Sequence, residues 1–388
     1  YNTQNVPILL NRMISLTAQY GYTVALNIIL AQISINSVML LWCTKIIGSF
    51  LSVPANTWLN TIQNKKPLLI ILELVKSGMF LLLPFFFHHW ILFAGVLLIE
   101  IIGDVFSGNL VALIPKLVNK KGLSRFNAAI TSVGSISYFL GPMLVGLLQG
   151  QQQAMLFYLY GIITFLGGLT LFALPSIKLN NQRLSKEFKR NVKSDVVHSL
   201  KALNAVKGLA GFYLIYILFD NMGTGLDSFE VIFVTKIIGI SSAQYAYSLS
   251  FLAIVFLIVS SILAFVNLQF PYRFVFQIGA LVFASYAIVL VVSRNLATVL
   301  FSYVLLAIGS TISGNMLDNM IQTQIADESR TQIFVVEDVF TNILAAATIF
   351  VMGFVQNIGL SITSTYVGLI ILTMSAYLII EFFMVRNS

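Results

Sequence analysis

Long apolar stretches follow one another along nearly the whole chain and constrain its fold more than any other feature. Hydrophobic residues make up 58% of the 388 residues and charged residues only 9%, which is too little polar side chain to cover a soluble protein of this size. A helix that crosses the hydrocarbon core of a bilayer needs about 20 apolar residues. The chain therefore has room for about twelve membrane-spanning helices, and we expect an all-α integral membrane protein.

Clusters of Asn, Gln, Gly, Pro and Lys separate the apolar stretches and set the predicted ends of the spans. Each stretch is long enough to cross a bilayer as one helix. The predicted spans are residues 8–33, 37–61, 67–87, 90–115, 124–149, 154–174, 206–236, 242–267, 271–292, 296–325, 331–357 and 363–385.

The distribution of basic residues predicts the orientation of these spans, because cytoplasmic connections are enriched in Lys and Arg. Most of them fall in alternate connections, above all in residues 176–205, whereas the opposite connections hold only Lys236 and Arg294. Both termini are therefore predicted to be cytoplasmic. The net charge of +8 reflects this topology and not nucleic-acid binding. We expect a multi-pass protein of the plasma membrane that contacts membrane lipids. The frequent use of Ile, Asn and Lys favours a bacterial source.

A weak internal repeat relates the two halves of the chain. PKLVNKKGLSRFNAA follows the fourth predicted span and QTQIADESRTQIFVV follows the tenth. Aligning Arg125 with Arg330 gives an offset of 205 residues, which also places the first span on the seventh. The repeat predicts two six-helix bundles, residues 1–175 and 206–388, joined by a basic cytoplasmic linker at residues 176–205.

These segments resemble the major facilitator superfamily, and within it the macrolide-efflux-like and siderophore-exporter-like branch. The segment from Ala326 to Phe334 is similar to that branch's Pro-Asp-Glu-x-Arg-Gly-Arg-Val-Phe. Gly141, Pro142 and Gly146 are similar to the family's antiporter motif, although close helix packing also explains small residues at this spacing. The resemblance implies the major facilitator fold and transport by alternating access.

Two positions depart from the family's pattern. The loop motif between the second and third spans, residues 57–66, lacks the usual Asp and its neighbouring Arg, and Glu100 stands where the family often has a base. The gating contacts must therefore differ from the family's. Glu73 and Lys76 are similar to an Asp-x-x-Arg pair of this branch. The gate candidates are Glu73, Lys76, Glu337 and Asp338.

Several ionisable residues lie inside the predicted spans, where each costs about 2.5–3.5 kcal/mol unless it faces a partner or a cavity. Asp104 and Asp220 lie nearest the span centres. Burial and nearby like charges favour the protonated form of an acid, which makes it a usable proton carrier. Alternatively, the acids form buried ion pairs with Lys45 and Arg12 that never titrate. The candidates for proton coupling or substrate binding are Asp104, Asp220, Glu100, Asp227, Lys45 and Asp318.

Polar residues three, four or seven apart form stripes on the first, fourth, seventh and tenth spans. Glu230 belongs to the stripe of the seventh span. The resemblance implies that these four spans line a central cavity. The cavity-lining candidates are Tyr20, Thr23, Asn27, Ser107, Thr224, Asn315 and Gln322.

The chain carries no motif for nucleotide hydrolysis, metal binding or covalent catalysis. It lacks a P-loop, and three His and one Cys are scattered along it. We therefore expect no enzyme activity, metal or cofactor. The expected function is that of a monomeric, proton-coupled exporter (an antiporter) of small amphipathic molecules, of the multidrug-efflux kind. The alternatives are uptake or facilitated diffusion of a metabolite, a lipid or glycolipid flippase, and a sensor that does not transport.

Overall fold

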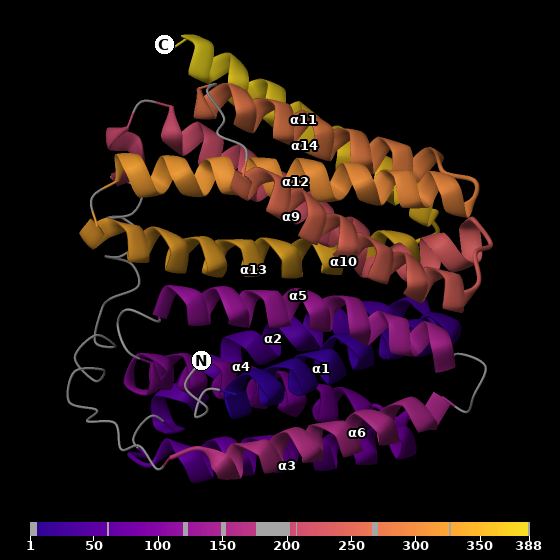
Figure 1. Cartoon of the computed structure of the whole chain (residues 1–388). Helices are drawn as coiled ribbons and strands as arrows, with labels where there is room; N and C mark the ends of the chain where they lie inside the picture. The colour runs from indigo at the N-terminus through magenta and orange to yellow at the C-terminus, as the bar shows by residue number, and fades with distance from the viewer. Residues whose placement is uncertain are drawn as a thin grey trace. The chain divides into compact units, whose positions relative to one another are not determined.

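The computed structural model describes residues 6–59, 62–118, 123–148, 153–175, 202–206, 208–265, 271–325 and 327–386. Long helices account for nearly all of these residues, and no strand occurs among them (Figure 1). Twelve helices in the described ranges are long and apolar enough to cross a membrane. The prediction of an all-α, twelve-span membrane protein is confirmed.

Six spans come before residue 175 in the chain. They are α1 (Val6–Ile33), α2 (Ile35–Leu59), α3 (Lys65–Leu82) with the 3₁₀ turn η2 (Leu83–Phe86), α4 (Ile91–Leu117), α5 (Leu123–Leu148), and α6 (Gln153–Thr170) with the 3₁₀ turn η4 (Leu171–Ala173). The predicted spans agree with these helices to within a few residues at most ends.

Six further spans follow. They are α9 (Leu209–Ile232) with the π-helical turn η5 (Phe233–Ile237), α10 (Ser242–Phe265), α11 (Tyr272–Val292), α12 (Leu296–Gln324), α13 (Asp327–Asn357) and α14 (Ile362–Arg386). Helix α13 begins four residues before the predicted start at 331, because the polar residues that open it are helical but not apolar.

Contacts between residues divide the chain into two compact units. The first comprises residues 1–188 together with 242–253, and the second comprises residues 189–241 together with 254–388. The first half of α10 thus belongs to the first unit.

Helix α1 packs closely against α5 in the first unit (Figure 1). A Cβ atom added to Gly141 would lie only 2.7 Å from the Gly21 backbone nitrogen and 2.8 Å from the Tyr20 Cβ atom. One turn away, the Ser137 hydroxyl donates to the Met13 carbonyl oxygen at 3.0 Å. The small residues of the α5 motif therefore let the two helix backbones approach each other.

Helices α11 and α12 cross in the second unit in the same manner. A Cβ atom on Gly279 would lie 2.8 Å from the Ser313 nitrogen, and the backbone of Phe283 lies against Gly309. Around this crossing, α9 packs against α11, α12, α13 and α14. Helix α9, which carries the acids Asp220, Asp227 and Glu230, is thus held on several sides.

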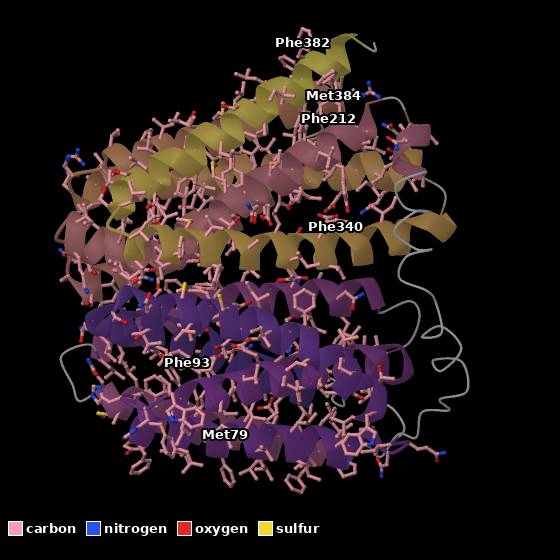
Figure 2. The ribbon with its side chains drawn as sticks, turned by 180° about the vertical axis from the view of Figure 1, so that it is seen from behind. Met79, Phe93, Phe212, Phe340, Phe382 and Met384 are labelled. Carbon is pink, nitrogen blue, oxygen red and sulfur yellow. The ribbon has the colours of Figure 1, made fainter. Side chains whose placement is uncertain are left out.

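Large apolar side chains project from the outer faces of the helices. Phe382 on α14 is 64% exposed, and Ile371 on the same helix is 60% exposed (Figure 2). In water such a surface would drive association, whereas lipid tails cover it without cost. The exposed faces thus fit a chain surrounded by lipid.

Candidate substrate and ion site

Helix α4 carries the polar stripe that the spacing predicts, and its first member is held by two neighbouring helices. The Glu100 Oε1 atom lies 3.0 Å from the Lys45 Nζ atom of α2. The Tyr22 hydroxyl of α1 donates to the same oxygen. The side chains of Lys45 and Glu100 are only 17% and 10% exposed, so this ion pair joins α1, α2 and α4 inside the first unit.

Lys45 is held by further contacts. Its ammonium group donates to the Thr23 hydroxyl at 2.9 Å. It also lies 5.3 Å from the centre of the Tyr22 ring and 5.9 Å from that of Trp42, within the range of cation–π attraction. These contacts compensate for the hydration that the ammonium loses in the bundle.

Asp104 lies one helical turn beyond Glu100 and has different surroundings. Its carboxyl group faces the hydroxyls of Ser49 and Ser52 on α2. Lys45 is near enough to attract it but forms its ion pair with Glu100. Asp104 therefore forms no ion pair in the described part of the chain, and its role as a proton carrier stays a prediction.

Ser107, the third member of the α4 stripe, accepts a hydrogen bond from Arg12 on α1. The Arg12 Nη1 atom lies 2.9 Å from the Ser107 Oγ atom. Arg12 also lies within electrostatic reach of Glu73 and Tyr20, but it forms no ion pair among the described residues. Each polar member of the stripe thus has its own partner from α1 or α2.

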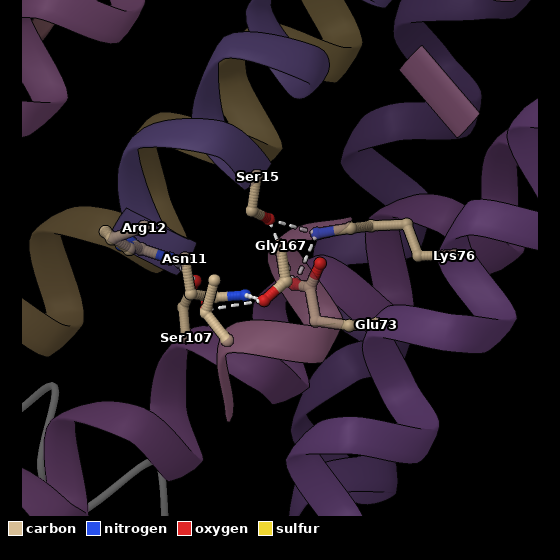
Figure 3. A network of polar contacts seen from close by, with 8 residues as sticks. Asn11, Arg12, Ser15, Glu73, Lys76, Ser107 and Gly167 are labelled. Atoms are coloured by element: carbon tan, nitrogen blue, oxygen red, sulfur yellow. Dashed lines mark hydrogen bonds and ion pairs between the residues drawn. The ribbon is translucent and has the colours of Figure 1, made fainter. Parts of the chain in front are cut away.

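Figure 3 shows a second charged network, which joins α1, α3 and α6 in the core of the first unit. The Lys76 Nζ atom lies 2.9 Å from the Glu73 Oε1 atom, and Ser15 bonds to both residues. Beside them, Asn11 donates to the Gly167 carbonyl at 3.0 Å. Glu73 and Lys76 are completely buried, so these two gate candidates lie within helix packing. Their role in gating stays a prediction.

The remaining first-half candidates lie on one helix. Tyr20 packs edge-on against Tyr138 of α5, with 5.1 Å between ring centres. Asn27 is buried, and its side-chain oxygen has no hydrogen-bond partner in the described structure. Both positions fit a polar lining, which stays a prediction.

In the second unit, three acids from different helices lie within electrostatic reach of one tyrosine. Asp220 of α9, Asp318 of α12 and Glu337 of α13 all interact electrostatically with the Tyr216 hydroxyl. Asp220 is half-buried and Asp318 is exposed. Sequence spacing alone could not bring these acids together, because they belong to separate spans. No group of three or more such residues in the described ranges fits a metal ion.

The other second-half candidates differ in exposure. Asp227, Asn315 and Gln322 are exposed, and Thr224 is half-buried. The side chain of Asp338 lies outside the described residues. The predicted polar stripes on α9 and α12 therefore lie partly open in this structure.

Glu230 is the buried acid that the choice of site candidates missed. It is 2% exposed, and its Oε1 atom has no hydrogen-bond partner in the described structure. Glu230 belongs to the predicted polar stripe of α9. Because it lies near the end of the helix, its position in the span made it a weaker candidate than Asp220. Its burial depends on side chains from α12 and α14, which the spacing within α9 cannot reveal.

The embedded acids have different charge partners in the two halves of the chain. Within the described ranges, both ion pairs lie in the first half, where Lys45 and Lys76 neutralise Glu100 and Glu73. The basic residues in the described ranges of the second half lie at helix ends or in connections, at Lys236, Arg273, Arg294, Arg330 and Arg386. The interior of the second unit is therefore acidic.

Twelve apolar helices with charges inside them define a multi-pass membrane protein with a polar interior. The chain belongs to the Major Facilitator Superfamily, whose sequence model matches residues 8–347. The protein is therefore a secondary transporter and not an enzyme. No curated protein sequence matches the chain significantly.

Solved structures with the same fold support this assignment. The nucleoside transporter NupG has a TM-score of 0.76 at 12% identity, and the match covers 99% of this chain and 100% of that one. The POT family transporter PepTSo has a TM-score of 0.74 at 10% identity, with 100% and 99% covered. A bacterial homolog of the human lysosomal transporter Spinster, facing inward and unoccupied, has a TM-score of 0.71 at 13% identity, with 100% and 96% covered. At these identities the likeness shows the fold alone.

Proposed function

We propose that this transporter is a proton-coupled exporter that exchanges small amphipathic molecules for protons by alternating access. The observation that carries the proposal is the presence of an embedded acid without an ion pair in each half, Asp104 on α4 and Asp220 on α9. A carboxylate in that setting is costly, so it binds a proton or a cationic group of the substrate. Such a carboxyl group can exchange a bound proton for a cationic group of the substrate.

The arrangement around Lys45 supports a way for the first half to respond to protonation. Glu100 and Asp104 lie one turn apart on α4, and Lys45 is bound to Glu100 while it attracts Asp104. Loss of a proton from Asp104 leaves a second carboxylate that competes for the ammonium group. A shift of Lys45 toward Asp104 would loosen the link to Tyr22 and Glu100, and so change the packing of α1, α2 and α4.

The acidic interior of the second unit supports a cationic amphipathic substrate. Asp220, Asp318 and Glu337 all act electrostatically on the Tyr216 hydroxyl, and an aromatic ring within reach of carboxylates suits an organic ammonium group. The likeness of the α5 segment to an antiporter motif favours export over uptake. The plasma membrane is the proposed location, with both termini in the cytoplasm, and a monomer is the proposed working unit.

The proposal is tested by Asp104→Asn and Asp220→Asn in proteoliposomes. We expect each variant to lose transport driven by a pH gradient, because an amide cannot release a proton. The matched control is Glu381→Gln, which removes a carboxyl group near the end of α14 and leaves both acids in place. Coupled transport at the wild-type rate in both Asn variants would refute the proposal.

One observation favours a second function, uptake or facilitated diffusion of an acidic metabolite. Arg12 is an embedded guanidinium whose hydrogen bond goes to the neutral Ser107 hydroxyl. Such a group suits a carboxylate or phosphate. Inhibition of transport by organic anions, abolished by Arg12→Gln, would favour this function over export of cations.

A further inference from the structure

The region around Glu230, where α9 meets α12 and α14, holds an embedded carboxyl group in apolar and aromatic packing. Phe229 and Phe233 flank it along the chain and are fully buried, as are Tyr303 of α12 and Tyr366 of α14. The rings of Phe233 and Tyr366 stack at 5.1 Å between centres. Water is therefore excluded from the Glu230 side chain in this conformation.

The groups that face Glu230 include no cation among the described residues. Asp227, three positions earlier on α9, repels a negative charge there, and the Tyr303 hydroxyl interacts with the carboxyl group. The Tyr366 hydroxyl donates its proton to the Leu226 carbonyl oxygen at 2.6 Å and not to the Glu230 carboxyl group. Helices α11 and α13 also pack against α9 but add no charged group to these surroundings. An ionised carboxylate in such a site would be buried and uncompensated.

We propose that Glu230 is a proton-binding site of the transporter, which gains and loses its proton as the neighbouring end of α9 closes and opens. This inference rests on the proposed proton coupling and adds a site to it. The bound proton neutralises the carboxyl group in the closed state. Release yields one proton and one carboxylate, and the carboxylate needs water or a substrate cation beside it.

The helix end beside Glu230 has the features that such opening requires. The π-helical turn η5 begins three residues later, at Phe233. Its wide hydrogen bonds run from the Ile238 nitrogen to the Phe233 oxygen and from the Ile240 nitrogen to the Val234 oxygen. Gly239 then adopts a φ of +84°, which other residues rarely tolerate. Single π-turns inside helices are rare and often occur at functional sites.

The proposed path of the proton to the buried group passes through Asp227. This residue is exposed, lies about one turn before Glu230 on the same helix, and interacts with it electrostatically. A proton that reaches the Asp227 carboxylate therefore needs only a small movement of the helix end to pass to Glu230.

The test measures proton occupancy and coupling separately, on the full chain in liposomes. Infrared spectroscopy of the wild type should show the carbonyl stretch of a protonated carboxyl group that persists at neutral pH. Glu230→Gln should remove the part of this band that remains in Asp104→Asn and in Asp220→Asn, and should abolish accumulation of a fluorescent amphipathic cation driven by a pH gradient, whereas exchange at equal pH continues. The matched control is Glu381→Gln on α14, where the carboxyl group accepts a hydrogen bond from Gln277 at 2.9 Å. It should retain both the band and the accumulation.

The outcomes separate this inference from the proposed function. If the wild type accumulates the cation and Glu230→Gln does so equally well, the inference is wrong and the proposed function stands. If no pH gradient drives transport in the wild type, the proposed coupling is wrong, and the band then reports only a protonated structural acid, which also overturns the inference. A wild type without the band whose melting temperature rises with sodium, unlike that of Glu230→Gln, would indicate a sodium site instead.

Discussion

At the scale of single residues, the buried pair Glu73–Lys76 offers a sharp test of what charges do inside the first unit. Lys76→Met would leave the Glu73 carboxylate buried without its cation. Removal of one partner from a buried pair costs about 3–5 kcal/mol of stability, whereas an uncharged replacement of both is far less costly. We therefore expect the single variant to melt well below the wild type in detergent, and Glu73→Gln/Lys76→Met to recover most of the loss. Equal melting temperatures for the single and double variants would contradict this account.

Single residues also show how much of the candidate site can be predicted from the sequence. Helical spacing identified the stripe of Glu100, Asp104 and Ser107, because residues on one helix face recur at known intervals. It could not predict that Lys45 would bind Glu100 and not Asp104, since that choice depends on how α2 lies against α4. For the same reason it missed Glu230, whose burial comes from two other helices.

At the scale of elements, the crossing of α1 and α5 predicts that two glycines on one helix respond differently to the same change. Gly141→Ala forces a Cβ atom against the α1 backbone and should destabilise the protein by about 1–3 kcal/mol. Gly134→Ala on the same helix meets nothing closer than a Leu16 methyl group at 4.0 Å, and should be neutral or slightly stabilising. Thermal melting of both variants measures the difference. A lower melting temperature for Gly134→Ala than for Gly141→Ala would contradict the packing.

Most elements could be predicted because an apolar stretch of this length has one stable form in lipid, a helix. Their ends were less predictable. The polar residues at the start of α13 are helical, although the hydropathy pattern starts the span only after them. The π-turn η5 also carries no sequence signal in the apolar pattern, because a change in hydrogen-bond register leaves composition unchanged.

At the scale of the whole molecule, the predicted topology places the connection of α2 and α3 in the cytoplasm and that of α3 and α4 outside. Gln63 and His89 are exposed in these two connections. In a Cys43→Ser background, His89→Cys should react with a membrane-impermeant thiol reagent in intact cells, and Gln63→Cys only after the cells are permeabilised. The reverse pattern would overturn the orientation derived from the basic residues.

The central claim for the whole molecule is that it exchanges a solute for protons. The most direct measurement uses purified protein in liposomes without nucleotide, with a fluorescent amphipathic cation outside and an acidic lumen. We predict that the cation accumulates inside, that the lumen becomes alkaline in step with it, and that a protonophore abolishes both. Uptake that stops at equal concentrations and ignores the protonophore would contradict the claim.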